Sequence, residues 1–583
     1  MVVFKNRSFA NKKDVPLLMG LALIAILVLN FAVSMVSLRL DLTNEKKYSL
    51  LSPTKKLVRE LKDEVLIKVY LEGEMSSDFK QLRQATKDVL TEFRAVGGKK
   101  IKYEFINPIK DRTKEERDAM LEDFLSKGLS PVNEQTGKAN ESKVTTVFPF
   151  ATAYYGGREF PIQLIQSQIG YDKKQTINNS IISLEYNFAN AIQKLTQYRP
   201  PRVAFTTGHG ELNALELADI QNQLVRLNYE VQMMDLSAQF QVPDKFDAII
   251  VAKPLTAFDE KDKYKIDQFV MKGGKVLWLI DATNASMDSL KANPTGQFVV
   301  DRSLNLDDLL FKYGARVNND IIQDINLCNP IPLVVGKMGN APQTELFPWY
   351  YFPLLISDNN HPIVKNLDPV AATFVSTIDT IQNKNVSKTI LLHTSDNSKA
   401  VLTPARVHFG ILQNKPNPQY FTQARLPVAV LMEGKFQSLY KNRLSSSFLA
   451  AGDSMPELKF LDESKDNRMI VISDGDIIKN IVRQDSSAYP LGFYPYTNQT
   501  FANKDFVLNC IQYLVDSEGL LAARNKEVKL RLLNTLRAND EKLKWQLVNV
   551  LFPILLIIGF GLGYRYWRRK RYATPAPPKQ TTG

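Results

Sequence analysis

Residues 202–211 read RVAFTTGHGE, and they decide how the larger part of the chain folds. The apolar run 202–206 predicts a buried strand, Gly208-His209-Gly210-Glu211 predicts a tight turn, and the periodic stretch 212–227 predicts a helix. A strand that feeds a helix through a glycine-rich turn is typical of α/β domains built on a parallel sheet.

The same alternation continues along the chain. Further strands are predicted at residues 229–236, 246–252, 275–280 and 469–473, and further helices at 259–271 and 505–514. The strands are continuous apolar runs, as expected of a mostly parallel, doubly wound sheet covered by helices on both faces. We therefore predict an α/β domain over residues 201–516, with a β-rich insertion at about 325–465.

A smaller α/β module is predicted upstream, over residues 41–197. Its helices are expected at 52–61, 78–96, 113–127 and 177–195, and its strands at 65–71, 101–106, 144–148 and 151–155. This β-α-β order with a later hairpin is compatible with a thioredoxin-like module that lacks redox cysteines. Pro200-Pro201 marks the boundary to the next domain.

Two uncharged apolar stretches bracket these domains, at residues 15–38 and 545–564. Twenty helical residues span roughly 30 Å, the thickness of the hydrocarbon core of a bilayer. A cleaved signal peptide is the alternative for the first stretch, because basic residues precede it and Ala32-Val33-Ser34 resembles a cleavage site. Its length favours an uncleaved anchor. Two spans place both termini on one side of a membrane and the middle of the chain on the other.

The second span carries Gly559 and Gly563, a small-xxx-small pair along which another membrane helix could approach closely. The alternative is that glycine is simply common in membrane helices. A basic juxtamembrane helix is predicted before this span, at 520–544, and a basic, disordered tail after it, at 565–583.

The net charge of +13 would by itself suggest a nucleic-acid partner. Residues 1–14, 524–544 and 565–583 together carry this whole excess, so that residues 15–523 are neutral overall. The basic residues thus lie at the predicted membrane boundaries, where they meet anionic headgroups. We expect no nucleic-acid binding by the large domain, and both termini in the cytoplasm.

Polar residues follow several predicted strands at their carboxyl ends, where open α/β sheets place ligands. The candidate ligand-binding residues are Gly208, His209, Gly210, Glu211, Asp281, Asp474 and Asp476. For the turn 208–211 we favour a structural role over ligand binding, and we expect Glu211 in the first turn of the following helix. For the aspartates, capping of the next helix is the alternative to a shared crevice.

Other chemistry leaves little trace in the sequence. Neither Gly273-Gly274-Lys275 nor Gly336-Lys337 fits a P-loop, so the chain is not expected to hydrolyse ATP itself. Cys510 has core spacing on a predicted helix and Cys328 lies in a predicted loop; pairing of the two stays open. We expect no cofactor, no metal site and no catalytic residue.

Several stretches together resemble the auxiliary, or substrate-binding, membrane subunit of gliding-motility-associated ABC transporters. They are Asp41-Leu42-Thr43, Lys47 to Leu50, Gly208 to Glu211, VLMEGKFQSLYKNR at 430–443, Asp474-Gly475-Asp476, 503–506 and 526–533. The resemblance implies an inner-membrane protein whose large domain faces the periplasm. It also implies a separate ATPase and a permease as partners, and an amidotransferase-like sheet without the catalytic cysteine.

The leading hypothesis is thus a non-enzymatic subunit of an ABC complex that contacts the permease and perhaps a ligand or envelope partner. The main alternative is a membrane-anchored periplasmic hydrolase or metal-dependent enzyme that uses His209, Glu211, Asp281 and Asp474. A third reading is a structural scaffold with an empty crevice.

Overall fold

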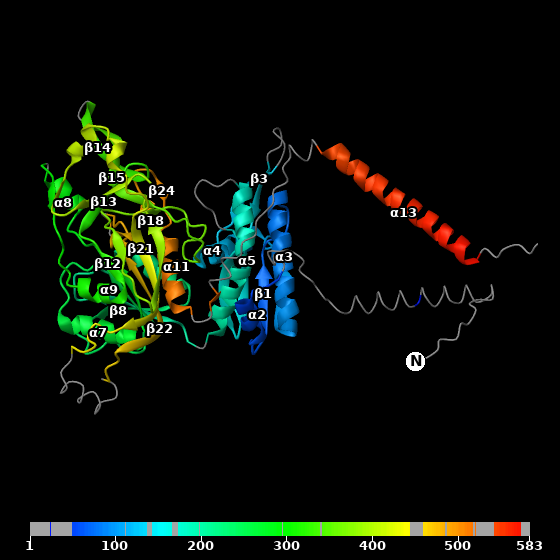
Figure 1. The fold of residues 1–583 in the computed structure, drawn as a ribbon, viewed down its shortest axis with the longest axis horizontal. Helices are drawn as coiled ribbons and strands as arrows, with labels where there is room; N and C mark the ends of the chain where they lie inside the picture. The colour runs from blue at the N-terminus through cyan, green and yellow to red at the C-terminus, as the bar shows by residue number, and fades with distance from the viewer. Residues whose placement is uncertain are drawn as a thin grey trace, which may run out of the picture. The chain divides into compact units, whose positions relative to one another are not determined.

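The computed structural model describes residue 24 and residues 49–110, 112–136, 143–165, 173–197, 199–293, 295–338, 341–443, 459–483, 485, 487–516, 519–520 and 541–572 (Figure 1). The first predicted membrane span, residues 15–38, lies outside the described residues apart from Ile24. The chain forms two compact units, residues 1–526 and 527–583, and each is described by itself.

A four-stranded sheet organises the N-terminal module, in the order β2-β1-β5-β6. Its strands are β1 (Val65–Val69), β2 (Ile101–Phe105), β5 (Phe150–Tyr155) and β6 (Arg158–Gln163). The strand β1 runs parallel to β2 and antiparallel to β5, which pairs antiparallel with β6. A separate hairpin joins β3 (Val132–Thr136) to β4 (Lys143–Val147). The β-α-β unit is as predicted, but the strands predicted at 144–148 and 151–155 do not pair with each other, because β4 pairs with β3 and β5 pairs with β1 and β6. The thioredoxin-like character stays a prediction.

Helices cover both faces of this small sheet. On one face lie α2 (Ser52–Arg59), α3 (Ser77–Gly97) and α5 (Lys173–Thr196), and on the other lies α4 (Lys114–Ser126). The alternation of β1 explains this: Val65, Ile67 and Val69 are fully buried against the first group of helices. Phe124 of α4 packs against Phe150 from the opposite face.

A seven-stranded sheet forms the larger domain, in the order β18-β21-β22-β10-β9-β7-β8. Its strands are β7 (Arg202–Thr207), β8 (Glu230–Asp235), β9 (Ala248–Ala252), β10 (Lys275–Leu279), β18 (Val386–His393), β21 (Pro427–Gln437) and β22 (Glu463–Ile472). The five strands from β22 to β8 are parallel, whereas β21 and β18 run antiparallel. The mixed α/β class is as predicted; its amidotransferase-like character stays a prediction.

The inner parallel strands β7, β9 and β10 bury side chains on both faces, which explains their continuous apolar runs, whereas the edge strand β8 is largely exposed on one face. In β10, Leu277 and Leu279 belong to one hydrophobic core, and Val276 and Trp278 belong to the other. The helices α6 (Ala218–Arg226) and α11 (Asn503–Val515) pack into the first core, and α7 (Glu260–Met271) and α9 (Asp307–Tyr313) pack into the second.

The range 325–465, predicted as a β-rich insertion, also contributes to the main sheet, because β18 and β21 lie within it and extend that sheet. Residues 428–432 are fully buried, since this strand is covered on both faces. The rest of the range contributes small sheets at the edge of the domain. They pair β14 (Cys328–Met338) with β15 (Ala341–Leu355), β15 with β16 (Val370–Ala371), β13 (Asp320–Asp324) with β19 (Ser398–Leu402), β12 (Ala315–Val317) with β17 (Ile378–Thr380), and β11 (Gln297–Val299) with β20 (Ala405–Val407).

Both cysteines are free. Cys510 is buried in α11 as predicted, whereas Cys328 begins the strand β14 instead of lying in a loop. The remaining short elements are α8 (Met287–Ala292), β23 (Phe493–Tyr494), β24 (Gln499–Thr500) and the 3-10 helices η1 (Gly98–Lys100), η2 (Phe409–Gln413), η3 (Pro418–Tyr420) and η5 (Asp476–Ile478).

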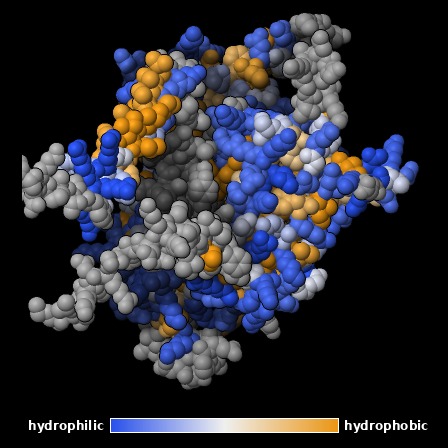
Figure 2. Space-filling model, turned by 90° about the vertical axis from the view of Figure 1, so that its right-hand side faces the viewer, coloured by the Kyte–Doolittle hydropathy of each residue, from blue (hydrophilic) through white to orange (hydrophobic). Residues whose placement is uncertain are grey.

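The second unit contains α13 (Lys542–Tyr572), a helix of 31 residues that includes the predicted span 545–564. By length and composition it is the one helix among the described residues that could cross a membrane. Its surface is hydrophobic along its length and hydrophilic at its basic end (Figure 2). The helix continues through residues 565–572, so the first eight residues of the predicted disordered tail are helical. Residues 521–540, most of the predicted juxtamembrane helix, lie outside the described residues.

Candidate functional site

The turn 208–211 follows β7 and packs closely on two neighbouring segments. Gly208 and Gly210 have φ of 115° and 75°, values that L side chains rarely adopt. A Cβ on Gly208 would lie 2.9 Å from Asp235 Oδ1, and one on Gly210 would lie 3.1 Å from Leu255 Cβ. The His209 carbonyl accepts hydrogen bonds from the backbone N–H groups of Leu255 (2.8 Å) and Thr256 (3.0 Å). Gly208 therefore serves the close contact of this turn with the end of β8, and Gly210 serves its close contact with the loop after β9.

The His209 side chain is only 5% exposed and stacks on Phe258, with ring centroids 3.8 Å apart and an angle of 11° between the planes. Its Nε2 lies 3.2 Å from Asp262 Oδ2, at the start of α7. Its Nδ1 lies 3.8 Å from Glu211 Oε1 and has no hydrogen-bond partner among the described atoms. His209 is thus held by a ring stack and one carboxylate.

Glu211 does not lie in the first turn of a helix, as the sequence predicted, because α6 begins only at Ala218. Asn213 delays the helix: its side chain accepts hydrogen bonds from the N–H groups of Leu215 (3.0 Å) and Glu216 (3.1 Å), which builds a local turn first. The Glu211 carboxylate instead accepts from the His209 N–H (2.6 Å) and from Thr206 Oγ1 (3.0 Å). It stabilises the turn from within.

The three candidate aspartates do gather, around a lysine that the sequence reasoning missed. Lys253 Nζ lies 3.2 Å from Asp281 Oδ2 and also contacts Asp476 Oδ1. Asp281 Oδ1 accepts from the Gly475 N–H at 2.6 Å. Asp474 accepts from the N–H groups of Asp476 (2.7 Å) and Thr373 (2.7 Å). We call Lys253, Asp281, Asp474 and Asp476 the Lys253 cluster.

The Lys253 cluster holds one ammonium and three carboxyl groups, and burial and mutual attraction shift their pKa values in different directions. Burial alone would lower the pKa of Lys253, but the attraction of Asp281 and Asp476 outweighs it and raises this pKa. Burial raises the pKa of Asp281 and Asp474, and in Asp474 the neighbouring Asp476 and Asp281 add to the increase. Burial also acts to raise the pKa of Asp476, but the adjacent Lys253 ammonium lowers it. Every member has a partner within the protein.

The structure therefore forms two networks at this edge of the sheet. Among the described residues, no hydrogen bond or ion pair joins His209 or Glu211 to Asp281, Asp474 or Asp476. Nor does any group of three or more His, Cys, Asp and Glu side chains in the described ranges have a geometry that could hold a metal ion. Lys253 and Asp262 could have been found from the sequence, since Lys253 directly follows β9 and Asp262 lies in the first turn of α7.

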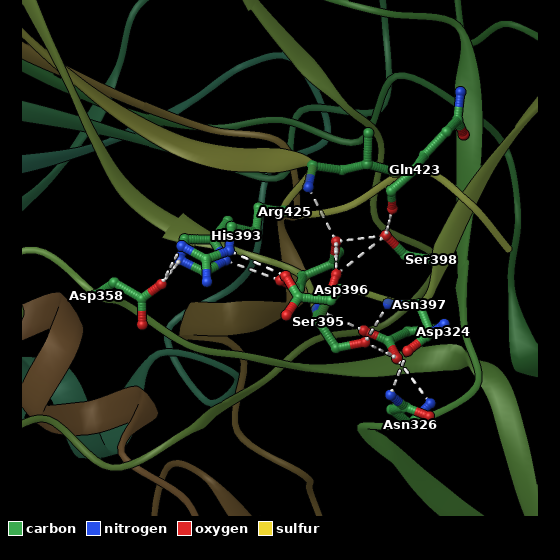
Figure 3. A network of polar contacts seen from close by, with 12 residues as sticks. Asp324, Asn326, Asp358, His393, Ser395, Asp396, Asn397, Ser398, Gln423 and Arg425 are labelled. Carbon is green, nitrogen blue, oxygen red and sulfur yellow. Dashed lines mark hydrogen bonds and ion pairs between the residues drawn. The ribbon is translucent and has the colours of Figure 1, made fainter.

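A third polar network, which the sequence analysis did not single out, lies among the small sheets (Figure 3). Asp324 is fully buried and accepts hydrogen bonds from both the N–H (2.8 Å) and the hydroxyl (2.7 Å) of Ser395. Arg425 links Asp358 (2.7 Å) and Asp396 (2.9 Å), and His393 Nε2 lies 3.5 Å from Asp358. These contacts fasten the ends of β13 and β18 to the loop before β21.

These features describe an α/β protein with one helix long and apolar enough to cross a membrane, and its candidate side chains bond to partners within the protein. The model of a protein family described as "ABC-type uncharacterized transport system" (ABC_transp_aux) matches residues 200–510, more than half of the chain. The chain belongs to this family and is an auxiliary component of an ABC transport system. A second model, for a domain of unknown function (DUF7088), matches residues 44–154.

Other comparisons add little. No curated protein matches the chain. Among solved structures, the chain is similar to the "mmIFT52 N-terminal domain" at 12% identity, over 54% of this chain and 97% of that one, with a TM-score of 0.29. A similarity of this size carries no argument about fold or function.

Proposed function

We propose that the chain is a non-catalytic auxiliary subunit of an ABC transport complex linked to gliding motility, anchored in the inner membrane with its folded domains in the periplasm. The family match over residues 200–510 carries this proposal. The family implies transporter components as partners, and we assign these as a permease and a separate ATPase. The link to gliding motility rests on the sequence resemblance, including residues 430–443 and 526–533.

The membrane part of the proposal is supported by α13. All its described large apolar side chains are exposed, and its last turns carry Arg568, Arg569, Lys570 and Arg571. An apolar helix that ends in a basic cluster is typical of a membrane anchor with its basic end in the cytoplasm. Gly559 and Gly563 leave open space on the helix surface and are our candidates for packing against the permease.

The absence of catalysis is part of the proposal, and the turn at 208–211 supports it. In α/β-hydrolases a strand–turn–helix of this kind exposes a nucleophilic serine. Here the corresponding His209 is buried against Phe258, and Glu211 bonds the backbone of the turn. A ligand-binding role for residues 208–211 and for the aspartates stays a prediction, and the internal bonding of both networks favours a packing role.

The test is purification of the full chain in mild detergent from its own cells, with identification of the proteins that co-purify. We expect an ABC ATPase and a multi-span permease. Replacing Gly559 and Gly563 with Ile should reduce the permease yield, whereas the matched pair Leu555→Ile and Leu562→Ile on the same helix should not. Recovery of the chain without any transporter component would refute the proposal.

Orientation can be tested by labelling with a membrane-impermeant maleimide. Leu402→Cys introduces a thiol at a side chain that is 74% exposed in the large domain. We expect labelling of this variant in cells whose outer membrane alone is permeabilised, and labelling of an Arg571→Cys variant only after lysis. The unmodified chain controls for Cys328 and Cys510. The reverse pattern would place the large domain in the cytoplasm.

A further inference from the structure

Three parts of the first unit meet at one place, which we call the junction. Helix α5 of the N-terminal module, Tyr229 at the start of β8 and the end of α11 all line it. The Tyr186 hydroxyl of α5 donates a hydrogen bond to Gln512 Oε1 of α11 at 3.0 Å. Leu520, which follows α11 in the chain, is 2% exposed and packs into the core of the N-terminal module. The chain thus leaves for the second unit from a point that is fastened to the first module.

Lys194 of α5 lies inside the junction. The residue is 4% exposed, and its Nζ lies 3.8 Å from the centroid of the Tyr229 ring. No described residue forms a hydrogen bond or an ion pair with this Nζ. It faces a cavity of about 20 Å³, enough for roughly one water molecule, lined by the amides of Asn190, Gln193, Gln197 and Gln512.

We propose that Lys194 makes the junction a proton-sensitive joint, which is closed while the amine is neutral and opens when the amine is protonated. Opening would separate α5 from the end of α11 and release Leu520 from the core of the N-terminal module. The proposal concerns the first unit alone and does not depend on which transporter partners the protein has.

The charged and titratable groups around Lys194 come from each of the packed elements. Tyr186 lies on α5 itself, and the Tyr229 ring covers the Lys194 amine. Asp516, directly after α11, is the carboxylate among the residues that line the cavity. Arg468 of β22 donates to the Asp516 carbonyl oxygen at 3.1 Å, which adds a second positive charge nearby. Among the described residues, no carboxylate lies at ion-pair distance from Lys194 Nζ, where it would stabilise a buried ammonium.

The electrostatics of the junction agree with this. Burial lowers the pKa of Lys194 to about 7, and the attraction of Asp516 offsets only part of that effect. In the open state the amine is solvated and its pKa returns to about 10.4. Between these two values the open state binds more protons, so the closed state gains stability as the pH rises from about 7 and loses it as the pH falls.

Hydrogen–deuterium exchange of the full chain in detergent, followed by mass spectrometry of peptides covering 186–197 and 510–520, measures this opening. After correction for intrinsic exchange, we expect the opening constant to rise about tenfold for each unit that the pH falls between about 9.5 and 8, the limit for one linked proton. Lys194→Met should remove this pH dependence. Lys174→Met, the same substitution at an exposed position of α5, should keep it.

Asp516→Asn provides a second variant if Lys194→Met does not fold. Because it removes the carboxylate that raises the pKa of Lys194, it should keep the slope and extend it below pH 7. A wild-type opening constant that does not change with pH would overturn the proposal. So would a Lys194→Met variant that retains the wild-type slope, or an Asp516→Asn variant whose slope ends at the same pH as the wild type.

Discussion

Gly475→Ala is the sharpest test of the Lys253 cluster, because a single methyl group would meet the centre of it. Gly475 has an ordinary φ of −77°, so the substitution brings no backbone strain of its own. The added Cβ would lie 2.5 Å from Lys253 Cβ, 2.6 Å from Cγ and 2.9 Å from Cα. Two of these atoms lie at or next to the backbone of Lys253, whose φ of 56° leaves it little freedom to move.

The cost follows from what must shift. Relief of the overlap requires the loop 474–476 to retreat, which stretches the 2.6 Å bond from the Gly475 N–H to Asp281. Overpacking of this kind costs about 1–3 kcal/mol, and loss of a hydrogen bond to a charged group costs about 1.5–3 kcal/mol. Because the retreat of the loop relieves the overlap while it weakens the hydrogen bond, the two costs do not simply add. We expect the free energy of unfolding to fall by about 3 kcal/mol, which lowers the melting midpoint of the large domain by about 6–12 °C.

The assay is thermal unfolding of the full chain in detergent, followed by the fluorescence of the fully buried Trp278 and Trp349. Gly336→Ala is the matched control, because its Cβ would meet nothing nearer than Gln343 Oε1 at 3.8 Å. That control should shift the midpoint by no more than about 1–2 °C. If Gly475→Ala and Gly336→Ala have the same melting midpoint, the close contact between Lys253 and the 474–476 loop does not exist as described.

Three further predictions concern the other networks. Asp324→Ala leaves both donor groups of Ser395 without the Asp324 carboxylate and should lower the free energy of unfolding by about 3–5 kcal/mol in a denaturant titration. The control Asp396→Ala breaks an exposed ion pair and should lower it by less than about 1 kcal/mol. Equal losses in the two variants would contradict the buried role of Asp324. Burial raises the pKa of Asp267, so this group stabilises the fold most below its unfolded pKa and progressively less as the pH rises through the folded value. The stability gap between wild type and Asp267→Asn should therefore narrow above about pH 4, and a gap independent of pH would refute this. His209→Phe keeps the stack on Phe258 and should leave transporter assembly unchanged at a cost of about 1–2 kcal/mol; loss of assembly in a folded variant would show that the imidazole itself is required.

The sequence predicts the parallel strands well because burial on both faces leaves a clear pattern. Residues 248–252 are all buried, and the predicted strand 246–252 differs from β9 by two residues. It predicts the start of α6 badly, because Asn213 bonds the backbone locally in a way that apolar periodicity does not reveal. The apolar run 428–432 was visible, but its pairing with β22 is a contact between distant segments that local patterns do not encode.

The candidate site shows the same limit in more detail. The rule that carboxyl ends of parallel strands share one edge correctly groups Asp281 with Asp474, because β10 and β22 are hydrogen-bonded neighbours. The rule fails for His209, because β9 and β10 lie between β7 and β22, and neighbouring strands are about 4.8 Å apart.

The order of the strands thus decides which polar side chains come into contact. In this sheet β9 lies next to β10, and Lys253 at the end of β9 therefore lies beside the aspartates. The lysine pairs with two of the aspartates, so that what the sequence presents as an acidic crevice is an ion cluster bonded within itself. A buried group whose hydrogen-bonding atoms already have partners within the protein has little to gain from a ligand, because a ligand must first displace those partners. The strand-end residues of this chain are therefore better candidates for holding the sheet to its neighbouring loops than for binding cargo. For a subunit that works within a transport complex, the surfaces that contact the partners become the more promising place to look for function.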